Sequence, residues 1–339
     1  MKVLYAVQAT GNGHIIRAET LIPIFSKSAE VDILLSGTSS DISLKYPVKY
    51  RFKGLSFTFG KKGGINILKS IMKIDIWQFF KDFRRLNLDQ YDLIISDFEP
   101  ISSWASIYQN KYCIALSHQF SLLCDEVPNL NRKAWLPKLI LKYYAPFSNG
   151  YGFHFKKYSN KIYLPIIKSD LINAKPIKKN YFVVYLPSYD DKTILKILSK
   201  VQKTNWIVFS KHTSEKYRQG NVKIKPISKE TFNKRLVNCR GVLCGAGFET
   251  PSEALYLKKK LMVIPMKNQY EQQLNALALE ELGVPVLYDF NNLIIDKLKL
   301  WVSSKKIIKV DYSESPKKIV DKVFLDFIKY SSKKTLLTT

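Results

Sequence analysis

The sequence predicts an α/β protein of two domains, each built on a parallel sheet, that face each other across a cleft. Apolar runs of strand length alternate with segments of helical period, an order typical of parallel sheets with helices on both faces. The alternation weakens between about residues 122 and 179, where Pro, Tyr, Asn and Lys accumulate, and then resumes. A length of 339 residues, 46% of them hydrophobic, is enough for two separate cores.

The first domain is expected over residues 1–165. Its strands and helices are predicted, in chain order, from KVLYAVQ, RAETLIPIFSKS, VDILLSG, YDLIISDF, ISSWASIYQ and YCIALSHQ. Ligands of such sheets bind at the carboxyl ends of the strands. The residues that follow each apolar run are therefore the candidates for function.

The second domain is expected over residues 180–314. Its elements are predicted from NYFVVYLPS, DKTILKILSKV, NWIVFSKH, VKIKPIS, KETFNKRLVNC, RGVLCGAG, TPSEALYLKK, KLMVIPM and YEQQLNALALEELG. A last helix is predicted from Ser315 to about Tyr330, because apolar side chains recur there at helical spacing on one face.

The chain carries a formal net charge of +26 at pH 7. Such a charge attracts nucleic acid, anionic lipid surfaces or phosphorylated substrates, although a lysine-rich composition alone also produces it. The four cysteines form no C-x-x-C pair and have no histidine at metal spacing, which disfavours a zinc site and fits a reducing compartment. No apolar stretch approaches the roughly 20 residues that span a bilayer, and no secretory signal pattern is present. We therefore expect a cytoplasmic protein.

The first predicted strand runs into ATGNGHIIRAE. Gly11 and Gly13 allow a ligand to approach the backbone closely, and the start of the next helix is a potential anion site. His14 lies at the end of the strand, either as a catalytic base or as a cap of a sharp turn. Ile16 interrupts the G-x-G-x-x-G spacing, which disfavours a dinucleotide site.

A second strand-to-helix turn reads LCGAGFETPSEAL. Thr250 is predicted to cap the helix, with Pro251 at its first position and Glu253 closing a capping box. The functional alternative places a diphosphate on this helix N-terminus, with Glu253 accepting hydrogen bonds from ribose hydroxyls. Glu271 and Gln272 in NQYEQQLNA begin the helix after the next strand. A carboxylate beside an amide suits the vicinal hydroxyls of a sugar, although both can simply be polar residues of a helix start.

The order of these three motifs resembles the GT-B glycosyltransferases. It is most similar to their inverting branch, which includes the UDP-sugar glucosyl- and glucuronosyltransferases and the lipid-linked GlcNAc transferase of peptidoglycan synthesis, and to a group of bacterial and archaeal glycosyltransferase-family proteins. The resemblance covers most of the chain and is most specific from Val242 to Pro285. It implies two Rossmann-like domains, with the acceptor in the first and a nucleotide-sugar, rather than a cofactor, in the second. It also implies that a last helix, residues 315–332, crosses back to the first domain.

The resemblance also implies roles for particular residues. His14 matches the general base that deprotonates the acceptor hydroxyl, and Glu253 matches the acid that binds the ribose. Glu271 and Gln272 match the pair that binds the donor sugar. Phe248, Glu249 and Thr250 match the loop and helix start that hold the donor diphosphate, and Gly13 and Gly247 are further donor-binding candidates.

Other residues at strand ends are expected to support the site, or else to be ordinary polar loop residues. Asp97 in IISDFEP is the candidate that orients His14 and stabilises its imidazolium, with an N-cap role as the alternative. The additional donor-side candidates are Ser188, Ser210, Lys211 and Ile227. The acceptor-side candidates are Asn12, His118 and Trp77.

Two positions depart from the family pattern. Gly245 stands where the plant enzymes have a histidine, so the phosphate charge must be met elsewhere, for which Lys211 is a candidate. Retaining members carry an acid eight residues before the Glu253 equivalent, which is again Gly245 here, so inversion in a single displacement is expected. Glu271 stands where aspartate is usual, which leaves the sugar open. SDFEP and YDDK lack D-x-D spacing, so the helix dipole and backbone donors, without a metal ion, are expected to stabilise the leaving group.

Two segments of the first domain, residues 67–87 and 131–147, interleave apolar and basic side chains. An apolar strip with basic residues at its rim suits an anionic membrane interface, and thus a lipid-linked or membrane-displayed acceptor and a peripheral location on the inner face of the membrane. The alternative is a pair of ordinary amphipathic helices that pack inward.

The expected activity is metal-independent, inverting transfer of a sugar from a nucleotide-sugar, UDP-linked, to a hydroxyl acceptor, as in the synthesis of cell-envelope glycans or glycolipids. A UDP-sugar 2-epimerase of the same fold is an alternative, but it would isomerise its substrate without an acceptor and usually needs more carboxylates. A basic nucleic-acid-binding protein is another. The sequence contains no recognised RNA- or DNA-binding motif, so nucleic acid is not an expected partner.

Overall fold

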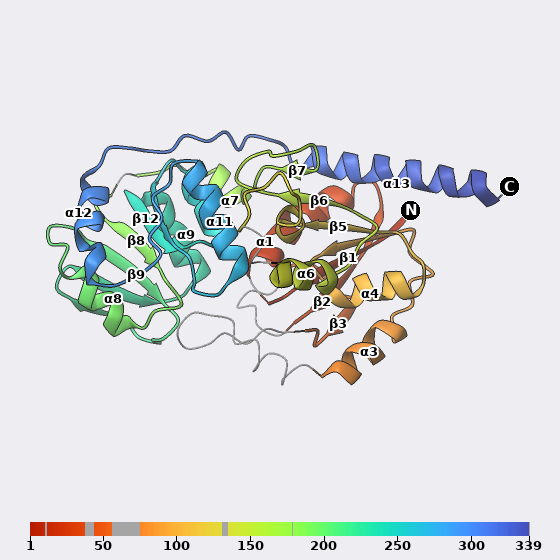
Figure 1. Cartoon of the computed structure of the whole chain (residues 1–339), viewed down its shortest axis with the longest axis horizontal. Helices are drawn as coiled ribbons and strands as arrows, with labels where there is room; N and C mark the ends of the chain where they lie inside the picture. The colour runs from red at the N-terminus through yellow and green to blue at the C-terminus, as the bar shows by residue number, and fades with distance from the viewer. Residues whose placement is uncertain (11, 38–43, 56–74, 131–134, 178, 339) are drawn as a thin grey trace.

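The computed structural model of the chain consists of two α/β domains in succession and a final helix that returns to the first (Figure 1). The structure describes residues 1–10, 12–37, 44–55, 75–130, 135–177 and 179–338, with side chains described up to residue 334. Gly11, residues 67–74 and residues 131–134, which belong to motifs singled out in the sequence, lie outside the described residues.

The N-terminal domain is built on a seven-stranded sheet in the order β3-β2-β1-β4-β5-β6-β7, and its neighbouring strands pair in parallel. The strands are β1 (Lys2–Gln8), β2 (Glu30–Ser36), β3 (Tyr50–Phe52), β4 (Leu93–Asp97), β5 (Cys113–Ser117), β6 (Asn149–Phe153) and β7 (Ile162–Tyr163). The described helices are α1 (Asn12–Phe25), α3 (Ile76–Arg85), α4 (Pro100–Tyr108), α5 (His118–Ser121) and α6 (Trp135–Tyr144).

Helices cover both faces of this sheet. Along β1, Val3, Tyr5 and Val7 pack with α1 in one apolar cluster, whereas Leu4 and Ala6 pack with α3 and α4 in another. Successive side chains of a strand point to opposite faces, so a strand buried on both sides must be apolar throughout. This is why the continuous run KVLYAVQ predicted a strand correctly.

The C-terminal domain contains a six-stranded sheet in the order β10-β11-β9-β8-β12-β13, parallel except for the β10–β11 pair. The strands are β8 (Phe182–Tyr185), β9 (Trp206–Ser210), β10 (Tyr217–Gln219), β11 (Val222–Pro226), β12 (Gly241–Gly245) and β13 (Lys260–Ile264). The described helices are α7 (Ser169–Ile172), α8 (Asp191–Leu198), α9 (Lys229–Asn238), α10 (Glu249–Tyr256), α11 (Tyr270–Glu281) and α12 (Ile295–Ser303), the last preceded by the 3-10 helix η2 (Asn292–Ile294).

The last helix, α13 (Lys317–Thr338), leaves the C-terminal domain and packs on the N-terminal one (Figure 1). Ile319, Val320 and Val323 are buried, and the ring of Phe324 contacts that of Phe25 in α1 with 5.4 Å between centroids. The predicted crossing back to the first domain is confirmed, and the helix extends beyond the expected Tyr330. The apolar stripe is what anchors it.

The predicted strands are present, but β3, β6, β7 and β10 do not stand out as apolar runs. The most informative of these is β6, which reads NGYGF and lies inside the sheet. A Cβ atom at Gly150 would lie 2.4 Å from the ring of Phe120, and one at Gly152 would lie 2.7 Å from Ser121. The glycines therefore let α5 pack directly on β6. Because they replace apolar side chains, β6 does not show the apolar run that identifies the other buried strands.

Among the described residues, no helix combines the length and apolar character needed to cross a membrane.

Candidate active site

The candidate site begins where two neighbouring strands of the first sheet end. β1 and β4 pair in parallel with Val7 opposite Asp97, so the turn that leads into α1 lies beside the carboxylate that ends β4. The helix after β1 was expected from about Arg17, but α1 already begins at Asn12. His14 and Arg17 are therefore one helical turn apart on the same face, and both reach Asp97.

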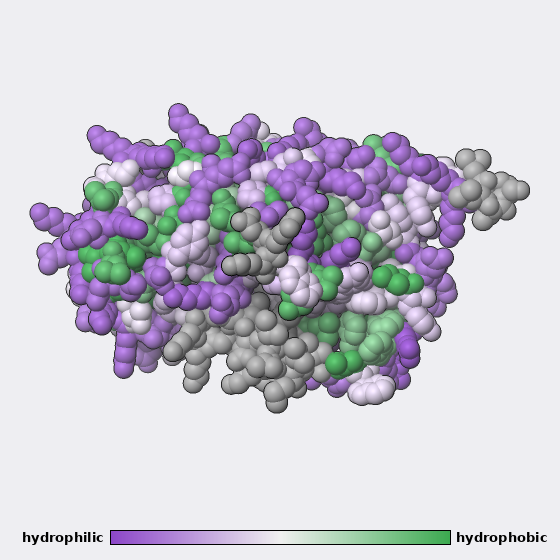
Figure 2. Space-filling model, viewed as in Figure 1, coloured by the Kyte–Doolittle hydropathy of each residue, from purple (hydrophilic) through white to green (hydrophobic). Residues whose placement is uncertain are grey.

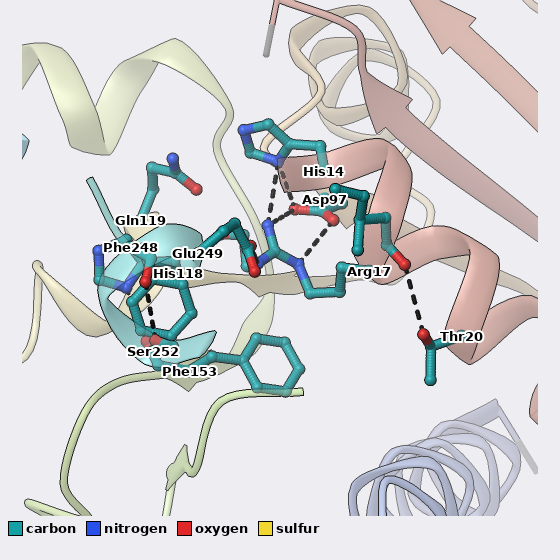
Figure 3. A network of polar contacts seen from close by, with 12 residues as sticks. His14, Arg17, Thr20, Asp97, His118, Gln119, Phe153, Phe248, Glu249 and Ser252 are labelled. Carbon is teal, nitrogen blue, oxygen red and sulfur yellow. Dashed lines mark hydrogen bonds and ion pairs between the residues drawn. The ribbon is translucent and has the colours of Figure 1, made fainter. Parts of the chain in front are cut away.

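The side chains of His14, Arg17 and Asp97 form one connected network (Figure 3). His14 Nδ1 lies 2.8 Å from Asp97 Oδ1. Arg17 donates to the same carboxylate twice, from Nε to Oδ2 and from Nη2 to Oδ1, each at 2.9 Å. Arg17 Nη2 also lies 3.1 Å from His14 Nδ1. In the tautomer that carries its proton on Nδ1, His14 donates to Asp97 and Nε2 keeps its lone pair.

Charge dominates the behaviour of this network. Asp97 is fully buried, and although burial opposes its ionisation, Arg17 and His14 hold its pKa below the ordinary value. Burial also opposes the charge of Arg17, but Asp97 and Glu249 outweigh it and raise the pKa of the guanidinium. Both groups are therefore ionised at neutral pH.

The alternative N-cap role of Asp97 is wrong. The N-cap of α4 is Glu99, whose carboxylate accepts from the backbone N–H groups of Ile101 and Ser102 at 2.9 and 2.6 Å. Phe98, between the two acids, has a positive φ of 55°, which is uncommon for an aromatic residue. Its ring stacks between His14 and Tyr144, with centroid distances of 6.5 and 4.7 Å. The turn thus supports the face of the histidine ring.

The second part of the site is the turn between β12 and α10. Thr250 was predicted to cap this helix, and that prediction is wrong: α10 begins at Glu249, with Phe248 in the N-cap position and no side-chain cap. Pro251 consequently stands third in the helix, where its missing N–H still costs no hydrogen bond. In contrast, side chains cap α8, α9 and α11. The N-terminus of α10 therefore has backbone donors that no cap occupies.

Phe248 is held at this position by the other domain. Its ring stacks on His118 of α5 with 4.0 Å between centroids and 7° between planes. His118 in turn places Nε2 2.8 Å from Asn275 Oδ1 and Nδ1 2.7 Å from the carbonyl oxygen of Phe153. Both ring nitrogens are thus engaged, and burial lowers the pKa of the ring. His118, expected on the acceptor side, lies in the junction between the domains.

Of the expected sugar-binding pair and ribose acid, Glu271 has a contact across this junction. Glu271, at the start of α11, accepts a hydrogen bond from Gln119 across the junction at 3.2 Å. Gln272 accepts from the backbone N–H of Met266 at 3.0 Å, in the loop after β13. Glu253 is buried and pairs with Lys168 Nζ at 2.6 Å, so the predicted capping box is not formed.

Glu249 and Gly13 bring the two turns into direct contact. Arg17 Nη1 lies 3.1 Å from Glu249 Oε1 (Figure 3), and a Cβ atom at Gly13 would lie 2.8 Å from Glu249 Cγ. Gly13 is therefore required for the approach of the acidic side chain. Burial raises the pKa of Glu249 to about 7, and Arg17 opposes this shift.

The remaining candidates are less closely connected. Ser188 lies in the turn after β8, and Ser210 donates to Asp191 at 2.5 Å while accepting from the N–H of His212. Lys211 is exposed, and Ile227 packs against the main apolar cluster. Trp77 lies on α3 and is 87% exposed. Among the described residues, no three His, Cys, Asp or Glu side chains gather where they could hold a metal ion.

The sequence interpretation missed Arg17. The signal was present, because a residue three positions after His14 shares its face of a helix. Without the partner carboxylates, however, an arginine in a predicted helix resembles any solvent-exposed basic residue of this lysine-rich chain.

Two parallel-sheet domains that meet at their strand ends, with a histidine–aspartate pair on one side and an uncapped helix on the other, define the class of GT-B glycosyltransferases. The model of glycosyl transferase family 1 matches residues 1–304, so the chain belongs to this family.

Solved structures share this fold at low sequence identity. UGT89C1 of Arabidopsis thaliana, solved with UDP, is 13% identical with a TM-score of 0.57, and the match covers 88% of this chain and 90% of that chain. The glycotransferase of kitacinnamycin is 12% identical with a TM-score of 0.57, over 97% and 95% of the two chains. VinC, solved with dTDP, is 11% identical with a TM-score of 0.50, over 96% and 95%. A search of the curated proteins found no match.

Proposed function

We propose that this chain is an inverting glycosyltransferase that moves a sugar from a nucleotide-sugar, UDP-linked, to a hydroxyl acceptor without a metal ion. The observation that carries the proposal is the position of the His14–Asp97 pair opposite the N-terminus of α10, to which Glu249 links it through Arg17. UGT89C1 and VinC, which share the fold, were solved with the nucleoside diphosphates UDP and dTDP. These support a nucleotide-linked donor.

His14 is proposed as the general base. Its Nδ1 proton is directed at Asp97, so Nε2 accepts the proton of the acceptor hydroxyl while the hydroxyl oxygen attacks the anomeric carbon of the donor. The bond from that carbon to the diphosphate breaks on the opposite face, which inverts the configuration. Asp97 then stabilises the imidazolium that forms.

The N-terminus of α10 is proposed to bind the leaving diphosphate. Its backbone N–H groups are free of a side-chain cap, and the positive end of the helix dipole favours the charge that develops on the departing oxygen. Gly247 precedes this helix, and a Cβ atom there would meet no atom within 4 Å. The open space leaves room for phosphate oxygens beside the backbone.

The rest of the donor is proposed to lie along the C-terminal domain. Glu253 would accept from the ribose hydroxyls, and Glu271 with Gln272 would bind the sugar. Ser188, Ser210, Lys211 and Ile227 follow neighbouring strands and would line the nucleotide. Asn12, in the first turn of α1, would face the acceptor.

Transfer and hydrolysis should be measured over a panel of nucleotide-sugars and hydroxyl acceptors, with His14→Ala as the comparison. We expect acceptor-dependent release of UDP by the wild type, a product of inverted configuration, and activity that persists in EDTA. Equal activity of the two proteins, or isomerisation of the donor without an acceptor, would contradict the proposal.

The acceptor is proposed to be presented at an anionic membrane surface, as in glycolipid or cell-envelope glycan synthesis. Of the ten residues of α3, only Asp82 and Phe83 are buried, and α6 buries only Tyr144. Figure 2 shows hydrophobic side chains gathered where α3 and α4 lie, on a largely hydrophilic surface. The exposed apolar residues of α3, α4 and α6 are Ile76, Trp77, Phe80, Ile107, Tyr108, Trp135, Leu136, Leu139, Ile140 and Tyr143.

Basic side chains accompany this apolar surface. Lys81, Arg84 and Arg85 are exposed on α3, and Lys142 is exposed on α6. Aromatic and aliphatic groups insert at the boundary of headgroups and acyl chains, while the cations meet anionic lipid. This arrangement supports the proposal of peripheral binding at the inner face of the membrane.

Flotation with vesicles tests the membrane proposal separately. The wild type should float with anionic vesicles and much less with neutral ones, and Trp77→Glu should weaken flotation. Leu293→Glu is the matched control, because Leu293 is 86% exposed but lies in η2 of the C-terminal domain. Equal flotation of both variants, or no preference for anionic lipid, would contradict a membrane surface on α3.

A further inference from the structure

The Asp97 carboxylate, which is proposed to assist His14, is already paired with the guanidinium of Arg17. Arg17 covers both of its oxygens with hydrogen bonds of 2.9 Å, and both side chains are buried. A carboxylate neutralised in this way offers little net charge to stabilise a second cation. On these two residues alone, an imidazolium at His14 would be an uncompensated buried charge.

Glu249 supplies the missing anion, and it comes from the other domain. Its carboxylate lies 3.1 Å from Arg17 Nη1, at the first position of α10. With neutral His14, the cluster holds two anions and one cation, and protonation of His14 brings it to balance. The contact exists only where α10 lies against Gly13 of α1.

We infer that Glu249 is a positioning residue that makes His14 an effective base only while the donor-binding helix α10 is seated against α1. The inference rests on the proposed function, and it links the proposed base, His14, to the proposed donor-binding helix, α10. Arg17 transmits the effect, because the negative charge of Glu249 compensates the guanidinium and leaves that of Asp97 to His14. Base activation is thereby coupled to the contact between the domains.

This arrangement makes the reaction sensitive to pH near neutrality. Burial raises the pKa of Glu249 to about 7, so the carboxylate is charged above that pH and neutral below it. When Glu249 is protonated the compensation is lost, and the rate should fall. The charged groups that face Glu249 are Arg17 and His14 of α1, Glu253 of α10 and Lys168 of the segment before α7.

The test replaces Glu249 by glutamine, which keeps the shape of the side chain and removes its charge. At saturating donor, we expect kcat of Glu249→Gln to fall about tenfold above pH 7 and to depend less on pH between pH 6 and pH 8. Glu280→Gln is the matched control, because the Glu280 carboxylate accepts a hydrogen bond from Tyr288 within the C-terminal domain, away from Arg17, and the variant should keep wild-type kinetics.

A second variant interrupts the same link without removing a charge. Gly13→Ala places a methyl group 2.8 Å from Glu249 Cγ and displaces the carboxylate from Arg17, so its kcat and pH profile should resemble those of Glu249→Gln. Wild-type kinetics of Glu249→Gln, or a loss of UDP affinity that accounts for its lower rate, would overturn the inference.

A measurement without turnover separates this inference from the proposed function. In an NMR titration, the ring of His14 should lose its proton at lower pH in Glu249→Gln than in the wild type, because the imidazolium has lost its compensating anion. An unchanged titration overturns the inference even in an active enzyme. A wild type that transfers no sugar contradicts only the proposed function.

Discussion

The chain contains two strand–turn–helix units of similar local structure, one of which presents side chains and the other backbone N–H groups. β1–α1 and β12–α10 each run from a buried parallel strand through a short turn into a helix that begins at the carboxyl end of its sheet. α1 presents the side chains of His14 and Arg17 from its first turns. α10 presents its uncapped backbone, because Phe248 packs on His118 instead of capping the helix.

The strand beside each unit accounts for the difference. β4 ends at Asp97 opposite the end of β1, so a buried carboxylate meets the side chains of α1. β13 pairs with β12 up to Ile264. The loop after β13 donates a hydrogen bond to Gln272 of α11 and, in the part of the chain that the structure describes, places no charged side chain at the turn before α10. A turn at the end of a parallel strand therefore acquires its chemistry from its neighbour in the sheet.

His14→Ala should produce the largest effect and tests whether α1 acts through side chains. Removal of a general base typically costs about 10²- to 10⁴-fold in rate, so kcat should fall by that amount while UDP binding is retained. Stopped assays and calorimetry measure the two quantities. A loss of UDP affinity instead would mean that β1–α1 binds the donor as β12–α10 does, and would contradict the distinction between the two units.

Asp97→Ala should cost the most stability. It leaves the buried guanidinium of Arg17 with Glu249 as its remaining carboxylate partner, and breaking a buried ion pair costs about 3–5 kcal/mol in the free energy of unfolding. Urea unfolding measures it. The double variant Asp97→Leu with Arg17→Met should recover part of that loss, because the two buried charges are removed together, while Glu249 loses a partner. A single variant as stable as the wild type would show that Arg17 does not depend on Asp97.

Gly247→Ala should have an intermediate effect, on the donor alone. The added methyl group meets no protein atom within 4 Å, so the melting temperature should not change. If the diphosphate occupies this space, KM for the donor should rise about tenfold, which corresponds to about 1.4 kcal/mol. An unchanged KM would place the diphosphate elsewhere and remove the proposed role of the α10 backbone.

Lys211→Ala should have the smallest effect. Lys211 is exposed, and a charge contact in solvent contributes about 0.2–1 kcal/mol, so KM for the donor should rise less than about fivefold. Titration of the donor at low and high salt measures it. A larger increase would mean that a side chain, rather than the helix N-terminus, carries most of the phosphate binding.

Much of this organisation was predictable from the sequence. Buried parallel strands must be apolar on both faces, so their runs, their order and the residues at their ends could be read directly, and His14 and Asp97 were among those residues. The failures were local. Thr250 had the composition of an N-cap, but the stacking of Phe248 on His118, from the other domain, sets where α10 begins.

By itself, the sequence determined the two α/β domains, the strand ends at which the candidate site residues lie and the apolar stripe that returns α13 to the first domain. Only the tertiary structure decided which strand-end side chains meet: Arg17 with Asp97, Glu249 with Arg17, and Glu253 with Lys168. The reason is physical. The apolar side chains of a strand or helix recur with a regular period, so a single segment reveals which of its residues are buried. The position of a buried charged residue depends instead on its partner, which can be distant in the sequence. Glu249, for example, lies more than two hundred residues from Arg17.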